Sequence, residues 1–99
     1  MHKIMDLLPT GEANAISAKQ LTDLCGYRYT RDLQKAIEAL RLDGEIIAST
    51  CQNGGGYFIP STDLELRQYV QTVRNRALNS LRSVSGAYKQ LKASSHLAE

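Results

Sequence analysis

Hydrophobic residues in the first part of the chain recur at helical spacing in three separate segments. In the first segment, 2–8, Ile4, Leu7 and Leu8 fall on one side of a predicted short helix. A proline follows, and the residue before a proline avoids the helical region, so the helix is expected to end there. After a loop, residues 15–17 leave room for a single strand bridge.

The second segment predicts a helix over 18–25. Its expected apolar face consists of Leu21, Leu24 and Cys25. Ser17 and Gln20 have the spacing of a capping box at the start of this helix. Gly26 suits the left-handed residue that ends many helices, so a glycine-containing turn is expected to lead into the next element.

The third segment, 30–44, predicts the helix around which the chain is organised. Its expected apolar face consists of Leu33, Ala36, Ile37 and Leu40. Thr30 is the expected N-cap, Asp32 suits the positive end of the helix dipole, and Gly44 is the expected stop. The opposite face carries Arg31, Gln34, Lys35 and Glu38, whose side chains could read base edges or simply form a solvated face.

After Gly44 the pattern changes to that of a β-hairpin. Residues 45–49 are β-branched and apolar, residues 50–55 form a turn region, and 56–59 are the expected returning strand. The Asn53-Gly54 pair inside the turn region is a strong hairpin signal that requires positive backbone φ angles.

The last third of the chain predicts one long amphipathic helix over 62–93, with Thr62 and Glu65 as a capping box. Its apolar residues recur at steps of three and four, with one extra step of four that resembles a coiled-coil stutter. They are Leu66, Val70, Val73, Ala77, Leu81, Val84, Tyr88 and Leu91. About 30 residues at 1.5 Å each span about 45 Å, which is longer than a 60-residue domain.

The far end of this helix therefore needs a partner, and the same helix of a second copy is the simplest one. The alternative is a helix that packs on its own domain as far as Leu81 and then frays. Ser83, Ser85 and Gly86 weaken its middle, because glycine costs about 1 kcal/mol in a helix interior. Residues 94–99 are expected to form a loose tail.

Composition narrows the possible classes of protein. With 99 residues and 42% hydrophobic content, the chain is long enough for one domain with an appendage, and the domains are expected at 1–61, 62–93 and 94–99. The net charge is +2, and the positive excess lies in the last third of the chain. We expect a cytoplasmic protein with no membrane span, because there is no long apolar run and no secretory signal.

The sequence contains no pattern that is typical of a catalytic, metal or nucleotide site. Cys25 and Cys51 are too few and too far apart for a zinc site or a disulfide framework, so we expect reduced thiols, no metal and no cofactor. No nucleophile is paired with a base. The three glycines 54–56 lie in the expected hairpin and not before a helix, so they do not form a nucleotide-binding loop. We therefore expect a protein that is not an enzyme.

The order of three helices followed by a glycine-tipped hairpin is that of a winged helix domain. Over residues 1–60 the chain resembles the DNA-binding domain of the biotin repressor, and small winged-helix proteins of phages and prophages. The residues that carry the resemblance are Ile16-Ser17, Gly26, residues 36–41, Gly44 and the Gly56-Tyr57-Phe58-Ile59-Pro60 segment. The fold class expected is α+β, mostly helical, a winged helix-turn-helix with a long, coiled-coil-like C-terminal helix.

The resemblance implies binding of double-stranded DNA through helix 30–43 and the 50–56 wing, in a small transcriptional regulator. The candidate contacts are Tyr27, Arg28, Tyr29, Thr30, Arg31, Gln34, Lys35, Glu38, Gln52 and Asn53. The chain departs from the repressor in having no biotin ligase domain and no lysine or arginine in its wing. The alternative is a winged-helix module that binds other proteins, such as an adaptor in a phage replication or regulatory complex. In either case a homodimer through the C-terminal helix is expected.

Overall fold

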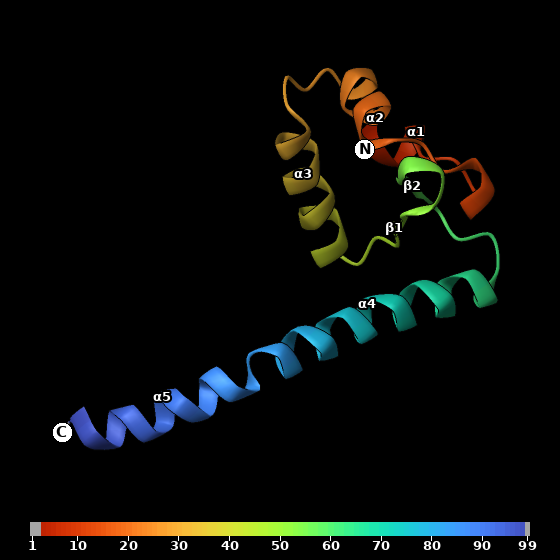
Figure 1. Ribbon diagram of the computed structural model, residues 1–99. Coiled ribbons are helices and arrows are strands. Elements are labelled where there is room, and N and C mark those ends of the chain that lie inside the picture. The colour runs from red at the N-terminus through yellow and green to blue at the C-terminus, as the bar shows by residue number, and fades with distance from the viewer. Residues whose placement is uncertain (1–2, 99) are drawn as a thin grey trace. The chain divides into compact units, whose positions relative to one another are not determined.

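The computed structural model describes the backbone of residues 3–98 and the side chains of residues 4–52 and 54–93. The chain is mostly helical with one small antiparallel sheet, which is an α+β arrangement (Figure 1). The elements are α1 (Lys3–Leu7), the 3₁₀ helix η1 (Glu12–Asn14), α2 (Ala18–Cys25), α3 (Thr30–Leu42), β1 (Ala48–Thr50), the 3₁₀ helix η2 (Gln52–Gly54), β2 (Gly56–Phe58), α4 (Asp63–Ser83) and α5 (Ser85–Ala98). The chain divides into an N-terminal unit that ends at Tyr69 and a C-terminal unit that begins at Val70.

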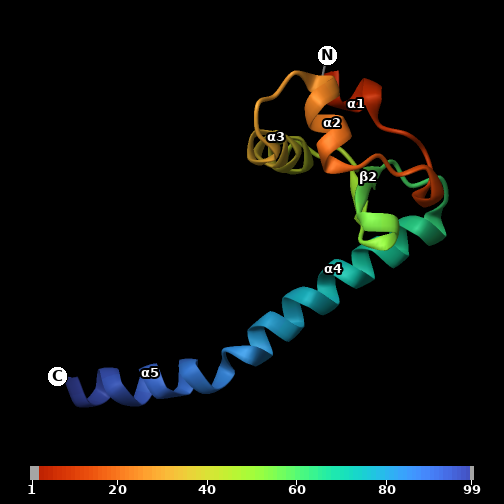
Figure 2. The same cartoon turned by 45° about the horizontal axis from the view of Figure 1, so that its top comes forward.

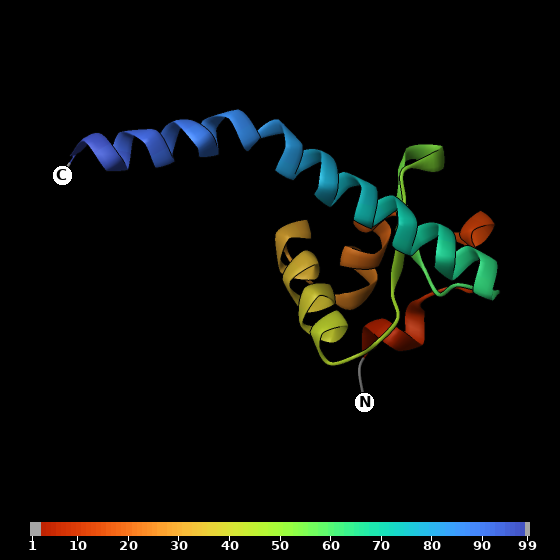
Figure 3. The same cartoon turned by 90° about the horizontal axis from the view of Figure 1, so that it is seen from below.

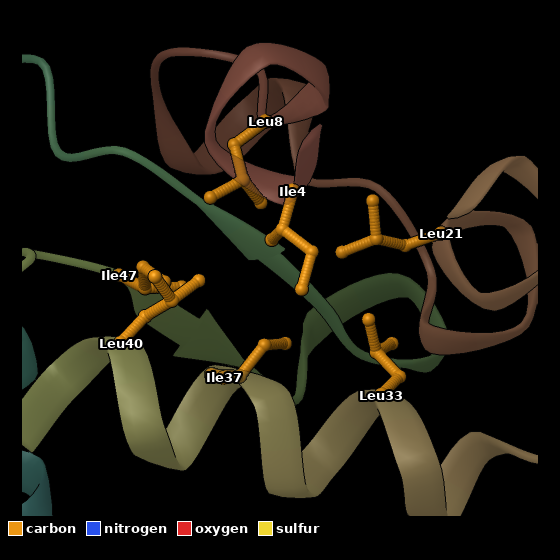
Figure 4. Close-up of a cluster of buried hydrophobic side chains, with 7 residues drawn as sticks. All are labelled: Ile4, Leu8, Leu21, Leu33, Ile37, Leu40 and Ile47. Atoms are coloured by element: carbon orange, nitrogen blue, oxygen red, sulfur yellow. The ribbon is translucent and has the colours of Figure 1, made fainter. Parts of the chain in front are cut away.

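The core of the N-terminal unit is small and aliphatic. It brings together Ile4, Leu8, Leu21, Leu33, Ile37, Leu40 and Ile47. Figure 4 shows the side chains of α3 pointing toward those of α1 and α2. Full burial of such a side chain stabilises the fold by about 1.5–3 kcal/mol, so this cluster supplies much of the driving force for folding. The apolar faces predicted for α1 and α3 are confirmed.

The face predicted for α2 is partly wrong. Leu24 is 54% exposed, whereas Thr22 is buried. The buried side chains of α2 are those of Leu21 and Thr22. The Thr22 hydroxyl donates a hydrogen bond to the carbonyl of Ala18 at 2.6 Å, which satisfies the polar group that burial would otherwise leave without a partner.

Both ends of α2 follow the predicted chemistry. The Ser17 hydroxyl accepts a hydrogen bond from the backbone N–H of Gln20 at 3.1 Å. Gly26 has a φ of +79° and ends the helix. The N–H of Tyr27 donates to the carbonyl of Thr22, which is the long bond of a Schellman motif. The resulting turn leads directly into α3.

The predicted N-cap of α3 is wrong by one residue. Tyr29 is the N-cap, with extended φ and ψ of −130° and 147°, and Thr30 is the first helical residue. The N–H of Asp32 donates to the carbonyl of Tyr29, so the helical ladder starts one residue earlier than expected. No side chain caps this end, because tyrosine has no short acceptor.

The C-terminal end of α3 includes residues that were expected in the first strand. Gly44 has a φ of +100° and ends the helix as predicted. The N–H of Glu45 donates to the carbonyl of Leu40, so this residue belongs to the helix terminus and not to a strand. Strand β1 therefore begins at Ala48, and the expected strand over 45–49 is wrong in its first three residues.

The sheet is a short hairpin that is tied to the chain before α2. Ala48 pairs with Phe58, Ser49 with Tyr57, and Thr50 with Gly56. Ile16 forms an antiparallel bridge with Tyr57, which confirms the single bridge expected near residues 15–17. Ile59 adds a parallel bridge to Thr10 instead of extending β2 to the predicted end.

The turn of the hairpin is longer than a two-residue loop. It contains η2, and both Gly54 and Gly55 have positive φ angles of 86° and 91°. The positive φ predicted at Gly54 is therefore confirmed. Figure 3 shows this turn extending away from α2 and α3.

The start of α4 is fixed by a network around one carboxylate. The Thr62 hydroxyl accepts from the N–H of Glu65 at 3.2 Å, as the predicted capping box requires. The Glu65 carboxylate accepts from Ser61, through its N–H at 2.9 Å and its hydroxyl at 3.1 Å, and from the N–H of Glu12 at 3.3 Å. The backbone hydrogen bond from Ser61 is the largest cause that lowers the pKa of Glu65 below its ordinary value.

The C-terminal unit is helical but not continuous. Helix α4 ends at Ser83, Val84 interrupts it, and α5 runs on to Ala98, so a single helix over 62–93 and a loose tail from 94 are both corrected. The Ser85 hydroxyl donates to the carbonyl of Arg82 at 2.9 Å. Such bonds compete with the helical ladder, and serine and glycine together are a recognised cause of kinks. Figure 2 shows the change of direction between the two helices.

We expect Gly56→Ala to destabilise the N-terminal unit. An added Cβ would lie 2.7 Å from the carbonyl oxygen of Ile16, and backbone cannot move aside as a side-chain end can. Overpacking of this kind costs about 1–3 kcal/mol, measurable by thermal or urea unfolding. Gly86→Ala is the matched control, because nothing lies within 4 Å of its Cβ and alanine favours a helix, so it should raise helicity. Equal stability of the Gly56→Ala variant and the parent would contradict the bridge at Ile16.

We expect Glu65→Gln to lower stability at neutral pH and to lose that effect in acid. A lowered pKa in the folded state means that stability is present above the unfolded value of 4.5 and is lost as the pH falls through the folded value. Urea midpoints at about pH 7 and about pH 3 would check this, with a smaller difference between wild type and variant at the lower pH. Glu45→Gln is the control, because the Glu45 carboxylate accepts no hydrogen bond from the described residues. A constant difference at both pH values would refute the assignment.

Candidate nucleic-acid interface

The outward face of α3 carries the predicted reading residues together. Arg31, Gln34, Lys35 and Glu38 are all exposed. Among the residues that the structure describes, none of these four side chains makes a hydrogen bond or ion pair to another. Core packing of Leu33 and Ile37 on the opposite side holds the helix so that this face points outward. The four polar side chains are therefore available to a partner.

The segment before α3 adds aromatic and cationic groups. Tyr27 and Tyr29 are 36% and 55% exposed, and Arg28 and Thr30 are exposed as well. The guanidinium carbon of Arg28 lies 5.8 Å from the centre of the Tyr29 ring, which is within cation–π range. These side chains stand at the start of α3, where hydroxyl and guanidinium groups of a groove-binding helix meet phosphate.

One cation of α3 faces inward and is not part of this surface. The Nε of Arg41 donates to the carbonyl of Ile47 at 2.8 Å. The guanidinium also lies 6.0 Å from the ring centre of Tyr57 and 5.6 Å from that of Tyr69. Its Nη2 is buried without a hydrogen-bond partner in the described part of the chain. Arg41 therefore fastens the end of α3 to the hairpin and to the first turns of α4.

With Arg41 turned inward, the exposed charges of α3 balance, and the C-cap Asp43 makes the sum −1. Arg31 and Lys35 remain as exposed cations, and the exposed anions are Asp32, Glu38 and the C-cap Asp43. The position of Arg41 in the sequence does not show whether its side chain turns inward or is exposed. The first turns of α4 supply Tyr69, and that contact is a tertiary one.

The hairpin turn offers hydrogen bonding without positive charge. Gln52 is exposed, and its backbone N–H donates to the Thr50 hydroxyl at 3.1 Å. The side chain of Asn53 lies outside the described residues. Residues 50–56 contain no lysine or arginine, so this turn would meet phosphate only through amides and backbone N–H groups.

The predicted dimerisation stripe is exposed throughout the C-terminal unit. Its members there are Val70, Val73, Ala77, Leu81, Val84, Tyr88 and Leu91. Leu81 and Leu91 are 65% and 68% exposed. The eighth residue, Leu66, belongs to the N-terminal unit, where it is half-buried and lines a hollow of about 360 Å³ with Ile46 and Ile59. The stripe thus leaves a large apolar surface without cover in the described chain.

The structure shows no other chemistry of note at this interface. Cys25 and Cys51 form no disulfide in the described part of the chain. In the described part of the chain, no three His, Cys, Asp or Glu side chains gather as metal ligands would. No described helix has the length and apolar character needed to cross a bilayer.

Comparison with protein-family models, with curated proteins and with solved structures finds no significant match for the chain. Function is therefore inferred from the residues of this chain and from their arrangement.

Proposed function

We propose that this chain is a winged helix-turn-helix protein that binds double-stranded DNA as a homodimer and regulates transcription. Helix α3 reads base edges in the major groove, and the hairpin turn meets the adjacent backbone. The protein acts by binding and catalyses no reaction.

The observation that carries this proposal is the outward face of α3. It presents long hydrogen-bonding side chains that have no partners among the described residues, while the inner face of the same helix is fixed in the core. Arginine pairs with guanine and glutamine with adenine through two hydrogen bonds each, so Arg31 and Gln34 are suited to base readout. A helix that is held in the core and carries unpaired polar side chains on its outer face has the form that a DNA groove requires.

The arrangement around α3 supports the winged form of this motif. Helices α2 and α3 are joined by a glycine turn, and a two-stranded hairpin follows α3. In a helix-turn-helix the second helix enters the major groove and the first crosses the backbone. In this assignment α2 is the crossing helix, and the turn at Gly54 and Gly55 is the tip of the wing.

Pairing of two copies is supported by the uncovered stripe of the C-terminal unit. Its residues follow coiled-coil spacing, and each large apolar side chain gains about 1.5–3 kcal/mol when buried. A dimer would also set two copies of α3 at a fixed separation, as a symmetric operator requires.

A second candidate function is a winged-helix module that binds another protein. It is favoured by the lack of cations in residues 50–56 and by exposed apolar side chains near α3. Leu42 is 83% exposed and Ile46 is 51% exposed. A protein partner would cover such groups, whereas DNA gains little from them.

The experiment that separates the two functions is capture of fragmented genomic DNA by the purified protein, followed by sequencing. Binding is compared at about 50 and about 200 mM salt, because phosphate contacts weaken steeply over that range. Enrichment of a common sequence supports the reader. If no DNA is bound at the lower salt concentration, DNA binding is refuted and the protein-binding module is the supported function.

We expect Arg31→Ala to weaken binding to a selected DNA site by about 1–3 kcal/mol, because a bidentate contact to guanine is lost. Folding should stay intact, since Arg31 is exposed and makes no contact that the core needs. Arg31→Lys is the matched variant, because it keeps the charge but loses the planar fork. Lysine should retain binding to random DNA while losing discrimination between sites. Unchanged discrimination in both variants would remove Arg31 from the reading set.

We expect Leu81→Asp combined with Val84→Asp to produce a monomer with a folded N-terminal unit. Both side chains lie on the stripe and are more than half exposed, so charge there opposes pairing without disturbing the core. Leu78→Asp is the control, because Leu78 lies off the stripe on the same helix. Sedimentation equilibrium measures the outcome, and a wild-type monomer at about 100 μM, where even weak pairing is populated, would refute the dimer.

A further inference from the structure

The C-terminal helices carry a one-sided distribution of charge that the reading helix does not explain. Between residues 66 and 98 there are six lysines and arginines and no aspartate or glutamate. Four of the cations follow the apolar stripe along the C-terminal unit. These are Arg74 and Arg82 on α4 with Lys89 and Lys92 on α5, and they are called the basic face below.

The basic face lies beside the stripe and not on it. At 3.6 residues per turn, Arg74 and Arg82 stand about 60° and 140° from the centre of the stripe on α4, and Lys92 and Lys89 take matching places on α5. All four are exposed. Arg74, Arg82 and Lys89 make no ion pair or side-chain hydrogen bond within the described residues, and Lys92 lies 5.1 Å from the Tyr88 ring centre. Arg76 stands on the opposite flank of the stripe.

We propose that the basic face binds the phosphate backbone of double-stranded DNA, as a second contact surface in addition to α3. This inference rests on the proposed function. In that function, α3 and the hairpin turn provide few cations to neutralise DNA phosphates. Within α3 the exposed charges balance, two cations against two anions, and the hairpin turn has no cation, whereas DNA affinity depends on the number of phosphates neutralised. Residues 66–98, with six lysines and arginines and no aspartate or glutamate, hold more positive charge than the reading surface does.

The spacing of the basic face suits this ligand. Arg74 and Arg82 are eight residues apart on α4, or about 12 Å, and Lys89 and Lys92 are three residues apart on α5, or about 4.5 Å. Double-stranded DNA carries one negative charge per about 1.7 Å of its axis, so each cation finds phosphate within reach without a precise register. In the proposed dimer the seam uses the stripe, and two basic faces remain outside it.

The same positive charge links dimerisation of the chain to DNA binding. Two copies that pair along the stripe bring many cations together, and residues 66–98 of each copy contain no aspartate or glutamate to offset them. Phosphate at the basic faces relieves this repulsion. Binding free energies are reciprocal, so DNA favours the dimer as much as the dimer favours DNA.

The test is the salt dependence of binding to a duplex of unselected sequence, followed by fluorescence anisotropy. The slope of log K against log salt falls in magnitude by about 0.9 for each phosphate contact that is removed. We expect Arg82→Gln to reduce the slope and Arg82→Gln with Lys89→Gln to reduce it further. Arg76→Gln, an equal charge loss on the other flank, should leave it nearly unchanged. Sedimentation at each salt concentration verifies that the variants are compared in the same oligomeric state.

The outcomes separate the two proposals. If wild type binds DNA and the Arg82→Gln and Arg76→Gln slopes agree, the basic face is refuted while α3 remains the reader. If Arg31→Ala loses site discrimination while the Arg82→Gln variants keep it and lose only slope, both proposals stand. If wild type does not bind DNA, both fall. Binding to vesicles of mixed phosphatidylserine and phosphatidylcholine, without binding to DNA, would overturn the phosphate-backbone assignment in favour of a membrane surface.

Discussion

Burial of one face of α3 is the constraint on which the N-terminal unit depends. Leu33 and Ile37 are enclosed by α1, α2 and the segment before β1. Because the helix has 3.6 residues per turn, fixing these two side chains also fixes which side chains point away from the core. The outward set that includes Arg31 and Gln34 is therefore placed by packing and not by any interaction of its own. Core packing thus orients in advance a surface whose own polar groups contribute little to stability.

The C-terminal unit follows a different constraint, because no core orients it. Its apolar stripe is uncovered among the described residues, and residues 66–98 contain no aspartate or glutamate, so the described contacts of this unit supply little beyond the helical ladder. Helix stability in proteins comes mainly from packing of an amphipathic face, and in the proposed dimer a second copy of the chain supplies that packing. The break at Val84 lies in the middle of this unit, where serine hydroxyls bond backbone carbonyls. A partner would have to follow the bend or straighten it.

Local chemistry made much of the fold predictable. The cap at Ser17 and the stops at Gly26 and Gly44 depend on neighbours within a few residues, and each is confirmed. The errors have tertiary or competing local causes. The strand expected from residue 45 was lost because the end of α3 captures the N–H of Glu45, and the long helix was interrupted by serine–backbone hydrogen bonds that its apolar pattern does not reveal. At the candidate interface, the exposure of Arg31, Gln34 and Lys35 followed from helical periodicity, whereas the inward turn of Arg41 depends on the distant Tyr69 ring.

That inward turn changes the electrostatics of the proposed reader. Once Arg41 is committed to Ile47 and two tyrosine rings, α3 has no excess of cations with which to attract DNA. Hydrogen-bond geometry at base edges gives discrimination, while phosphate neutralisation gives most non-specific affinity. Under the two proposals made above, these tasks fall on different units, discrimination on α3 and attraction on the basic face. Ionic strength would then alter affinity through the C-terminal unit while leaving the preference among sequences to the N-terminal one.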